Sequence, residues 1–269
     1  HRDLHSFPTR RSSDLVPHCD ICRWWQSCIG KRRADDHLSL VAGLANTHAK
    51  QINEWQVDTL EGFAHMAFPL PKPSKGAKET YTRLKEQARV QLEARERNEK
   101  VYECLPLEMG RGLCRLPEPS PGDVFFDFEG DPFVGTSGIE YLFGFVFEHT
   151  LEDYHALWAF TPEQEKVAFE SFIDFMMANW EHYPNFHIYH FTGYETGALK
   201  RLAGKYGTRE DELDRLLRGQ RFVDLHSITR QSLRAGIETY SLKELEQFHG
   251  FIRQLDLRDA SLHLRLLEG

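Results

Sequence analysis

The stretch DVFFDFEGDP, residues 123–132, has the apolar composition of a buried strand but carries acids in its interior. Because successive side chains of a strand point to opposite faces, Asp127 and Glu129 share one face with Phe125. Acids on an apolar strand cost free energy unless they are compensated, and hard divalent cations bind oxygen ligands of this kind. The stretch therefore predicts a divalent-metal site for phosphoryl transfer. The alternative is a pair of edge-strand acids that face water.

The composition indicates where the protein is expected to act and which partners it is expected to bind. The chain has 269 residues, of which 41% are hydrophobic, and a formal net charge of -8. No apolar run approaches the ~18 residues of a transmembrane helix, so we expect no membrane association. The acidic balance argues against non-specific coating of nucleic acid, but it allows a nucleic acid substrate in a local basic groove. Five cysteines, three of them clustered, are typical of a reduced compartment, and we expect a cytoplasmic protein.

Composition and turn-forming residues also indicate how the chain is divided. Residues 1–15, HRDLHSFPTRRSSDL, lack the apolar core of a signal peptide and resemble a translated sequencing adapter, so we expect them to be non-native. The remaining regions are a cysteine cluster (16–34), a small helical segment (35–68), a linker with a charged helix (69–120) and a main domain (121–269). The last boundary lies at the break PEPSPG, residues 117–122.

Two stretches before the main domain have helical patterns. Apolar residues spaced three and four apart predict a small hairpin of helices within residues 36–66, with Asp36 as a helix cap. Residues 69–78 are rich in Pro and Lys and predict a linker. Residues 79–100 predict a long, highly charged helix.

The main domain shows a clear order of elements. Strands at 123–129, 139–148 and 154–160 have short connections, which favour antiparallel pairing. Further expected elements are a helix from Thr161, a strand at 186–191, helices at 195–206 and 208–218, a strand at 222–226 and a helix from Ser241. We therefore predict an α/β fold with a mixed sheet, in which three antiparallel strands precede alternating helices and parallel strands. This is the element order of the ribonuclease H-like fold.

The motifs of this domain resemble a known family. Residues 123–250 are similar to the YprB-type ribonuclease H-like domain of the DEDD exonuclease superfamily, whose first motif, Asp-x-Glu, falls on Asp127 and Glu129. The second motif matches YHFTGYETGAL, residues 189–199, and places a carboxylate at Glu195, where the family usually has Asp. The resemblance implies a 3'-5' exonuclease that uses two divalent ions, Mg or Mn, held by these three acids. The alternative for Glu195 is a first-turn acid stabilised by the helix dipole.

The rest of the family's acidic set is incomplete. Asp224, in FVDLH, lies where this fold often carries a supporting catalytic acid, and a structural aspartate is the alternative. The fourth metal-binding Asp has no counterpart, because Asp256 and Asp259 are predicted to lie in a loop and a helix cap. We therefore expect a domain truncated at its C-terminus and a fragment that is itself nearly inactive.

The cysteine cluster predicts a second metal site. Cys19, Cys22 and Cys28 could hold a soft metal or an iron-sulfur cluster, but a closed site needs four ligands. The spacing resembles the C-terminal trio of RecB-like nucleases, whose remaining Cys lies far upstream, and this implies an iron-sulfur cluster in the full-length protein. Zinc with His18 or His37 is one alternative, and unliganded buried thiols are another.

The resemblance extends over the native part of the chain. Residues 16–269 are similar to RecB-like nucleases that carry a ribonuclease H-like domain, which implies a nucleic acid substrate and a helicase domain or subunit as partner. The segment 35–68 resembles a helix-hairpin-helix module, with plain packing as the alternative. Lys200, Arg201 and Lys205 could steer phosphates or form a solvated helix face. The alternative function is a non-catalytic nucleic-acid-binding or structural module.

Overall fold

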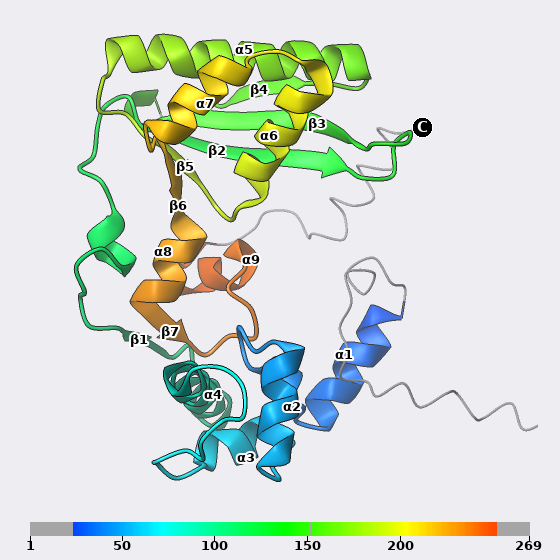
Figure 1. Cartoon of the computed structure of the whole chain (residues 1–269), viewed down its shortest axis with the longest axis vertical. Helices are drawn as coiled ribbons and strands as arrows, with labels where there is room; N and C mark the ends of the chain where they lie inside the picture. Colours follow the sequence, from blue (N-terminus) through cyan, green and yellow to red (C-terminus); the bar gives the residue numbers. More distant parts are fainter. Residues whose placement is uncertain (1–23, 151, 252–269) are drawn as a thin grey trace, which may run out of the picture. The chain divides into compact units, whose positions relative to one another are not determined.

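The computed structural model describes residues 24–150 and 152–251, which form two compact units (Figure 1). One unit runs from Leu105 to Ser232 and is called the sheet unit below. The other combines the chain before Leu105 with the chain after Ser232 and is called the helical unit. No helix in the described part of the chain is both long enough and apolar enough to cross a membrane.

The sheet unit contains a five-stranded sheet of order β4-β3-β2-β5-β6. Its strands are β2 (Val124–Asp131), β3 (Ile139–Phe147), β4 (His155–Trp158), β5 (Ile188–His190) and β6 (Phe222–Asp224). Strands β2, β3 and β4 pair antiparallel, whereas β5 is parallel to β2 and β6 is parallel to β5. The structure thus confirms the predicted α/β fold with its mixed sheet.

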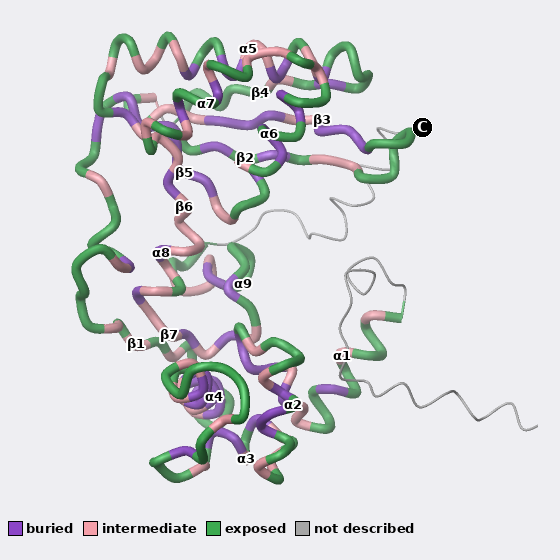
Figure 2. Tube along the Cα trace, in the orientation of Figure 1, coloured by how far each residue is buried: buried purple, intermediate pink, exposed green. Residues whose placement is uncertain are grey.

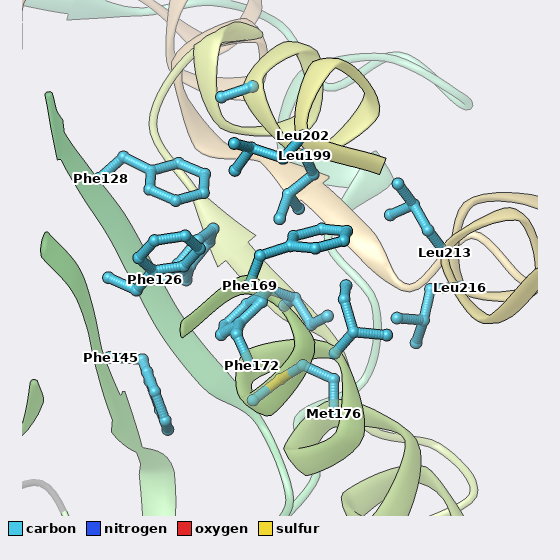
Figure 3. Close-up of a cluster of buried hydrophobic side chains, with 14 of the residues drawn as sticks. Phe126, Phe128, Phe145, Phe169, Phe172, Met176, Leu199, Leu202, Leu213 and Leu216 are labelled. Carbon is cyan, nitrogen blue, oxygen red and sulfur yellow. The ribbon is translucent and has the colours of Figure 1, made fainter. Parts of the chain in front are cut away.

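Three helices cover one face of this sheet. They are α5 (Pro162–His182), α6 (Tyr194–Tyr206) and α7 (Glu210–Arg218). Phe126 and Phe128 of β2 pack in one buried cluster with side chains of all three helices, including Phe172 and Leu202 (Figure 3). Because strand residues alternate, this packing leaves the acids of β2 on the opposite face.

Local sequence signals explain where these helices begin and end. The Thr161 hydroxyl accepts the backbone N–H of Gln164 and caps α5, as predicted. Gly207 ends α6 with a φ of +57°, a conformation that favours glycine. Strand β6 is shorter than predicted because the chain turns at once into α8 (Leu225–Ser232), a helix that the sequence pattern did not indicate.

The helical unit is built around one long helix, α4 (Lys78–Arg97) (Figure 1). Its other elements are α1 (Trp25–Ala34), a 3₁₀ turn (Leu38–Leu40), α2 (Asn46–Glu54), α3 (Leu60–His65), β1 (Tyr102–Cys104), β7 (Leu233–Ala235) and α9 (Leu242–Leu245). The predicted helix hairpin corresponds to α2 and α3. The prediction that Asp36 caps a helix beginning beside it is wrong. Its Oδ2 instead accepts the backbone N–H of Glu61 in the first turn of α3, at 2.7 Å.

Helix α4, the predicted charged helix, is a core element of this unit. Figure 2 shows buried positions along it, and Gln87 and Gln91 are among them. The Gln87 side chain donates to the carbonyl of Ala235 at 2.8 Å, while Gln91 donates to that of Leu40 at 2.8 Å. These contacts satisfy buried backbone groups that would otherwise be costly.

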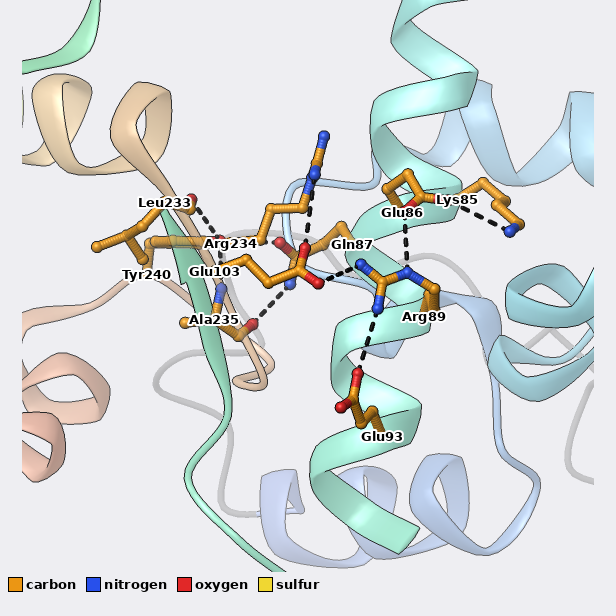
Figure 4. Close-up of polar contacts among 10 residues, drawn as sticks. All are labelled: Lys85, Glu86, Gln87, Arg89, Glu93, Glu103, Leu233, Arg234, Ala235 and Tyr240. Carbon is orange, nitrogen blue, oxygen red and sulfur yellow. Dashed lines mark hydrogen bonds and ion pairs between the residues drawn. The ribbon is translucent and has the colours of Figure 1, made fainter. Parts of the chain in front are cut away.

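The segment after Ser232 belongs with α4. Strand β7 pairs antiparallel with β1, and Arg89 of α4 forms an ion pair with Glu103 of β1 (Figure 4). The predicted main domain, 121–269, therefore differs from the sheet unit at both ends, because the unit begins at Leu105 and the chain leaves it after Ser232. Sequence periodicity carries no information about such a long-range strand pairing.

Candidate active site

The candidate acids lie toward the carboxyl ends of the parallel strands. In β2, Asp127 follows Phe125, whose partner in β5 is Tyr189. Strand β5 then ends at His190, and Glu195 lies in the first turn of the helix that follows. Because β2 and β5 are parallel, these groups are directed to the same edge of the sheet, where open α/β sheets commonly bind ligands.

The electrostatics of Asp127 show the influence of two neighbouring carboxylates. Asp127 is solvent-exposed, yet protein atoms around its carboxyl group reduce its hydration and raise its pKa to about 6. The backbone N–H of Phe128 donates to Oδ1 at 2.9 Å and opposes this shift. The negative charges of Glu195 and Glu129 raise the pKa further. Asp127 thus lies in a field of uncompensated negative charge.

The donor set fits a hard divalent cation. Within the described residues, neither Asp127 nor Glu129 forms an ion pair with a cationic side chain. The atoms that these two residues offer to a metal are all carboxylate oxygens, which Mg²⁺ and Mn²⁺ prefer over sulfur or nitrogen. Over residues 24–150 and 152–251, however, no three His, Cys, Asp or Glu side chains already form a group that could hold a metal ion. Glu195 therefore needs separate consideration.

Glu195 is buried and hydrogen-bonded. Only 3% of it is exposed, and one carboxylate oxygen, Oε2, lies 3.2 Å from His190 Nδ1 and 3.5 Å from the Thr192 hydroxyl. Thr192 has a φ of +123°, an uncommon value for a β-branched residue, and its hydroxyl accepts the backbone N–H of Tyr194. The short turn between β5 and α6 thereby fixes where Glu195 lies.

Asp224 has a visible structural role. Its Oδ1 accepts the backbone N–H of Ser227 at 3.1 Å, as a helix cap does for α8. Its backbone pairs with that of His190, so it lies at the same sheet edge as the other acids. One carboxylate oxygen of Asp224 is thus used as a helix cap, and the role of Asp224 as a supporting catalytic acid stays a prediction.

Glu140 is a residue of this region that the sequence analysis missed. Only 2% of it is exposed, and its carboxylate accepts the Tyr194 hydroxyl at 2.8 and 3.0 Å and pairs with Arg201. Its backbone partner in β2 is Gly130, where a Cβ atom would overlap Glu140 Oε2. Glu140 thus links Gly130, which follows Glu129, to Tyr194, which precedes Glu195. A lone acid in the apolar strand IEYLFGFVF was the available signal.

Two of the three predicted phosphate-steering cations pair with buried carboxylates. Arg201 pairs with Glu140, and Lys205 Nζ lies 2.6 Å from Oε2 of Glu165, which is fully buried. Their predicted role in steering phosphates stays a prediction. Lys200 is exposed and forms no ion pair among the described residues.

Tyr154 is a second residue that the sequence analysis missed. Asp127 lies opposite Gly144 in β3, and a Cβ atom at Gly144 would overlap the Tyr154 hydroxyl. Burial raises the pKa of Tyr154, and the charges of Asp127 and Glu129 raise it further. The structure therefore places a phenol beside the two acids of β2.

The predicted cysteine site lies mostly outside the described residues. Cys19 and Cys22 fall there, as do residues 1–15. Cys28 lies on α1 as an exposed free thiol. In the zinc alternative His37 was a candidate ligand, but its Nδ1 accepts the backbone N–H of Ser39 at 3.1 Å. The iron-sulfur site stays a prediction.

Strand order, helix placement and the acids at the strand ends together define an RNase H-like domain. Residues 124–265, more than half of the chain, match the sequence model of the RNase H superfamily, and the chain belongs to that superfamily. No curated protein and no solved structure matches the chain. Membership suggests nuclease-type activity on nucleic acid, and nucleases of this fold generally use divalent metal ions.

Proposed function

We propose that the protein is a metal-dependent nuclease of the 3'-5' exonuclease type, in which Asp127, Glu129 and Glu195 hold divalent ions. The observation that best supports this proposal is the raised pKa of Asp127, to which both other acids contribute. Carboxylates that repel one another without a cationic partner are stabilised when a cation binds between them. The match to the RNase H superfamily supports the same chemistry.

Each residue has a defined part in this proposal. Asp127 and Glu129 present their oxygens from one face of β2, and Glu195 completes the set when its carboxylate turns from His190 toward them. Two bound divalent ions would supply the activation of water and the stabilisation of the leaving oxygen. The Tyr154 hydroxyl can donate a hydrogen bond to a phosphate oxygen beside these acids.

The finer assignment to the YprB-type and RecB-like nucleases belongs to the same proposal. It rests on the motifs around Asp127 and Glu195 and on the spacing of Cys19, Cys22 and Cys28. It brings with it an iron-sulfur cluster in the full-length protein and a helicase domain or subunit as partner.

The second candidate function is a nucleic-acid-binding module that does not cleave. It is favoured by the contacts of Glu195, which is already hydrogen-bonded to His190 and Thr192. In this alternative Glu195 stabilises the first turn of α6 and binds no metal.

Manganese binding and cleavage distinguish the two functions. The chain should bind Mn²⁺ by calorimetry, and Asp127→Asn should lose that binding because it removes a ligand charge. Because the fragment itself is expected to be nearly inactive, cleavage of end-labelled single-stranded DNA and RNA with Mg²⁺ or Mn²⁺ is measured on a chain extended at its C-terminus, where it should fall at least about 100-fold in the same variant. Asp211→Asn, at an exposed position in the first turn of α7, is the matched control and should behave as the unaltered chain. Equal Mn²⁺ affinity in both variants would favour the non-catalytic module.

A further inference from the structure

The described cations of the helical unit differ in whether they have an acidic partner. Seven of them pair with an acid: Lys31, Arg33, Lys85, Arg89, Arg95, Arg97 and Arg234. Five others, on α2, in the segment before α4 and at the start of α4, have no ion-pair partner among the residues that the structure describes. They are Lys50, Lys72, Lys75, Lys78 and Arg83. These five lie within residues 50–83, whereas Lys100 donates to the carbonyl of Gln247 and Lys243 lies on α9.

The segment that carries Lys72 and Lys75 is held in place by buried side chains. Gln51 of α2, only 5% exposed, accepts the backbone N–H of Ser74 at 2.6 Å and that of Lys75 at 3.3 Å. Tyr81 of α4, only 2% exposed, donates its hydroxyl to the carbonyl of Lys75 at 3.0 Å. The lysine side chains themselves are exposed. A fixed backbone lowers the entropy that a ligand must remove on binding.

The same contacts bring the other cations near this segment. Tyr81 contacts the ring of His48 on α2, with 5.6 Å between ring centroids. Arg83 lies close enough to His48 to help lower the pKa of that imidazole, after the larger effect of burial. Lys50 is on the same helix, next to Gln51, and Lys78 is the first residue of α4. These cations thus lie on segments that meet at one anchor, formed by Gln51 and Tyr81.

Two acids lie in the same area but do not cancel this charge. Glu54 accepts the side-chain amide of Gln51 at 2.7 Å, and Glu79 lies in the first turn of α4. Five cations against two acids leave a local positive excess in a chain whose net charge is -8. Lysine ammonium groups bind phosphates as point charges, without reading base sequence.

We propose that this basic surface, formed by Lys50, Lys72, Lys75, Lys78 and Arg83, binds the phosphate backbone of a nucleic acid. The inference rests on the proposed nuclease function, for which it supplies a substrate-holding surface on the helical unit. A tethered binding surface raises the local concentration of substrate for the unit joined to it. Long substrates should benefit, whereas very short ones should not.

Binding without cleavage tests this surface directly. The triple variant Lys72→Ala, Lys75→Ala and Lys78→Ala is compared with the unaltered chain by fluorescence anisotropy of labelled DNA and RNA strands of about 20 nucleotides, in EDTA. We expect affinity at about 50 mM salt to fall at least about tenfold. The slope of log K against log salt should become shallower by about 2, since each phosphate contact on a single strand contributes about 0.7.

A second triple variant controls for net charge. Lys31→Ala, Arg33→Ala and Arg97→Ala removes the same charge from cations that are paired on the surface. It should leave affinity within about twofold, because exposed ion pairs contribute little. Equal weakening in both triple variants would overturn the proposal, as would unchanged binding in the first. Stronger binding to vesicles of anionic lipid or to polyglutamate than to the oligonucleotides would also overturn it.

The two proposals can fail separately. Oligonucleotide binding in EDTA tests the basic surface, whereas cleavage in Asp127→Asn tests the acids of β2. Loss of cleavage in Asp127→Asn, with normal oligonucleotide binding in the first triple variant, would support the nuclease function and overturn the basic surface. Normal cleavage in Asp127→Asn, with weak binding in the triple variant, would do the reverse.

Discussion

Two pairs of acids in the sheet unit differ in whether their negative charge is compensated by nearby side chains. Glu140 and Glu165 are almost completely buried, and both have cationic and phenolic partners from α6. Asp127 and Glu129 lie on the opposite face of the sheet and have no cationic partner among the described residues. The compensated pair has the properties of a structural network, whereas the uncompensated pair has those of a cation-binding site.

Removal of one buried partner should have the largest effect on stability. Glu165 accepts the backbone N–H of Glu140 at 2.6 Å as well as the Lys205 ammonium. Glu165→Ala leaves these donors without an acceptor, and we expect the free energy of unfolding to fall by about 3 kcal/mol. Urea denaturation measures this loss. Glu163→Ala, on the exposed side of the same helix, should change stability far less; comparable losses would contradict the structural role of Glu165.

Loss of the hydrogen bond between Tyr194 and Glu140 should weaken metal binding more clearly than it lowers stability. Tyr194→Phe removes the hydroxyl that joins Glu140 to the residue before Glu195, and Tyr206→Phe removes an equivalent hydroxyl from Glu165. Each variant should lose about 1.5 kcal/mol of stability. Only Tyr194→Phe should weaken Mn²⁺ binding, by about tenfold, because it alone releases the turn that carries Glu195. Equal Mn²⁺ affinities would show that Glu140 does not position the site.

The pH dependence of Asp127 should give the smallest effect. Its pKa is about 6 in the folded chain and 3.8 in an unperturbed carboxyl, so the folded state holds this proton more tightly. The resulting stability is present below the unfolded pKa and is lost as pH rises through about 6. Asp127→Asn cannot lose a proton, so its Tm relative to the unaltered chain should rise by a few degrees between about pH 4.5 and 8. A constant difference across that range would contradict the raised pKa.

Local patterns predicted much of the sheet unit correctly. Period-two alternation placed Asp127 and Glu129 on one face, and the Thr161 cap located the start of α5. These features depend on residues that are close in sequence, so spacing alone reveals them. The same reasoning failed for α8, whose start is defined by a single capping contact from Asp224.

Contacts between distant residues were beyond such patterns. Arg201 reaches Glu140 across 61 positions and Lys205 reaches Glu165 across 40, so neither cation could be distinguished from a surface charge. For the same reason the sequence predicted the charged helix α4 but not its contact with β7, where Gln87 reaches Ala235 across 148 positions.

By itself, the sequence determined the order of strands β2 to β6 with helices α5 to α7 between them, and the shared face of Asp127 and Glu129. Both follow from periodicities of the backbone, which act over a few residues. Only the tertiary structure decided which charges are compensated, that β7 joins β1, and that the lysines before α4 are held on a fixed backbone by Gln51 and Tyr81. These outcomes depend on which side chains meet after the chain has folded, and burial then determines whether a charge needs a partner.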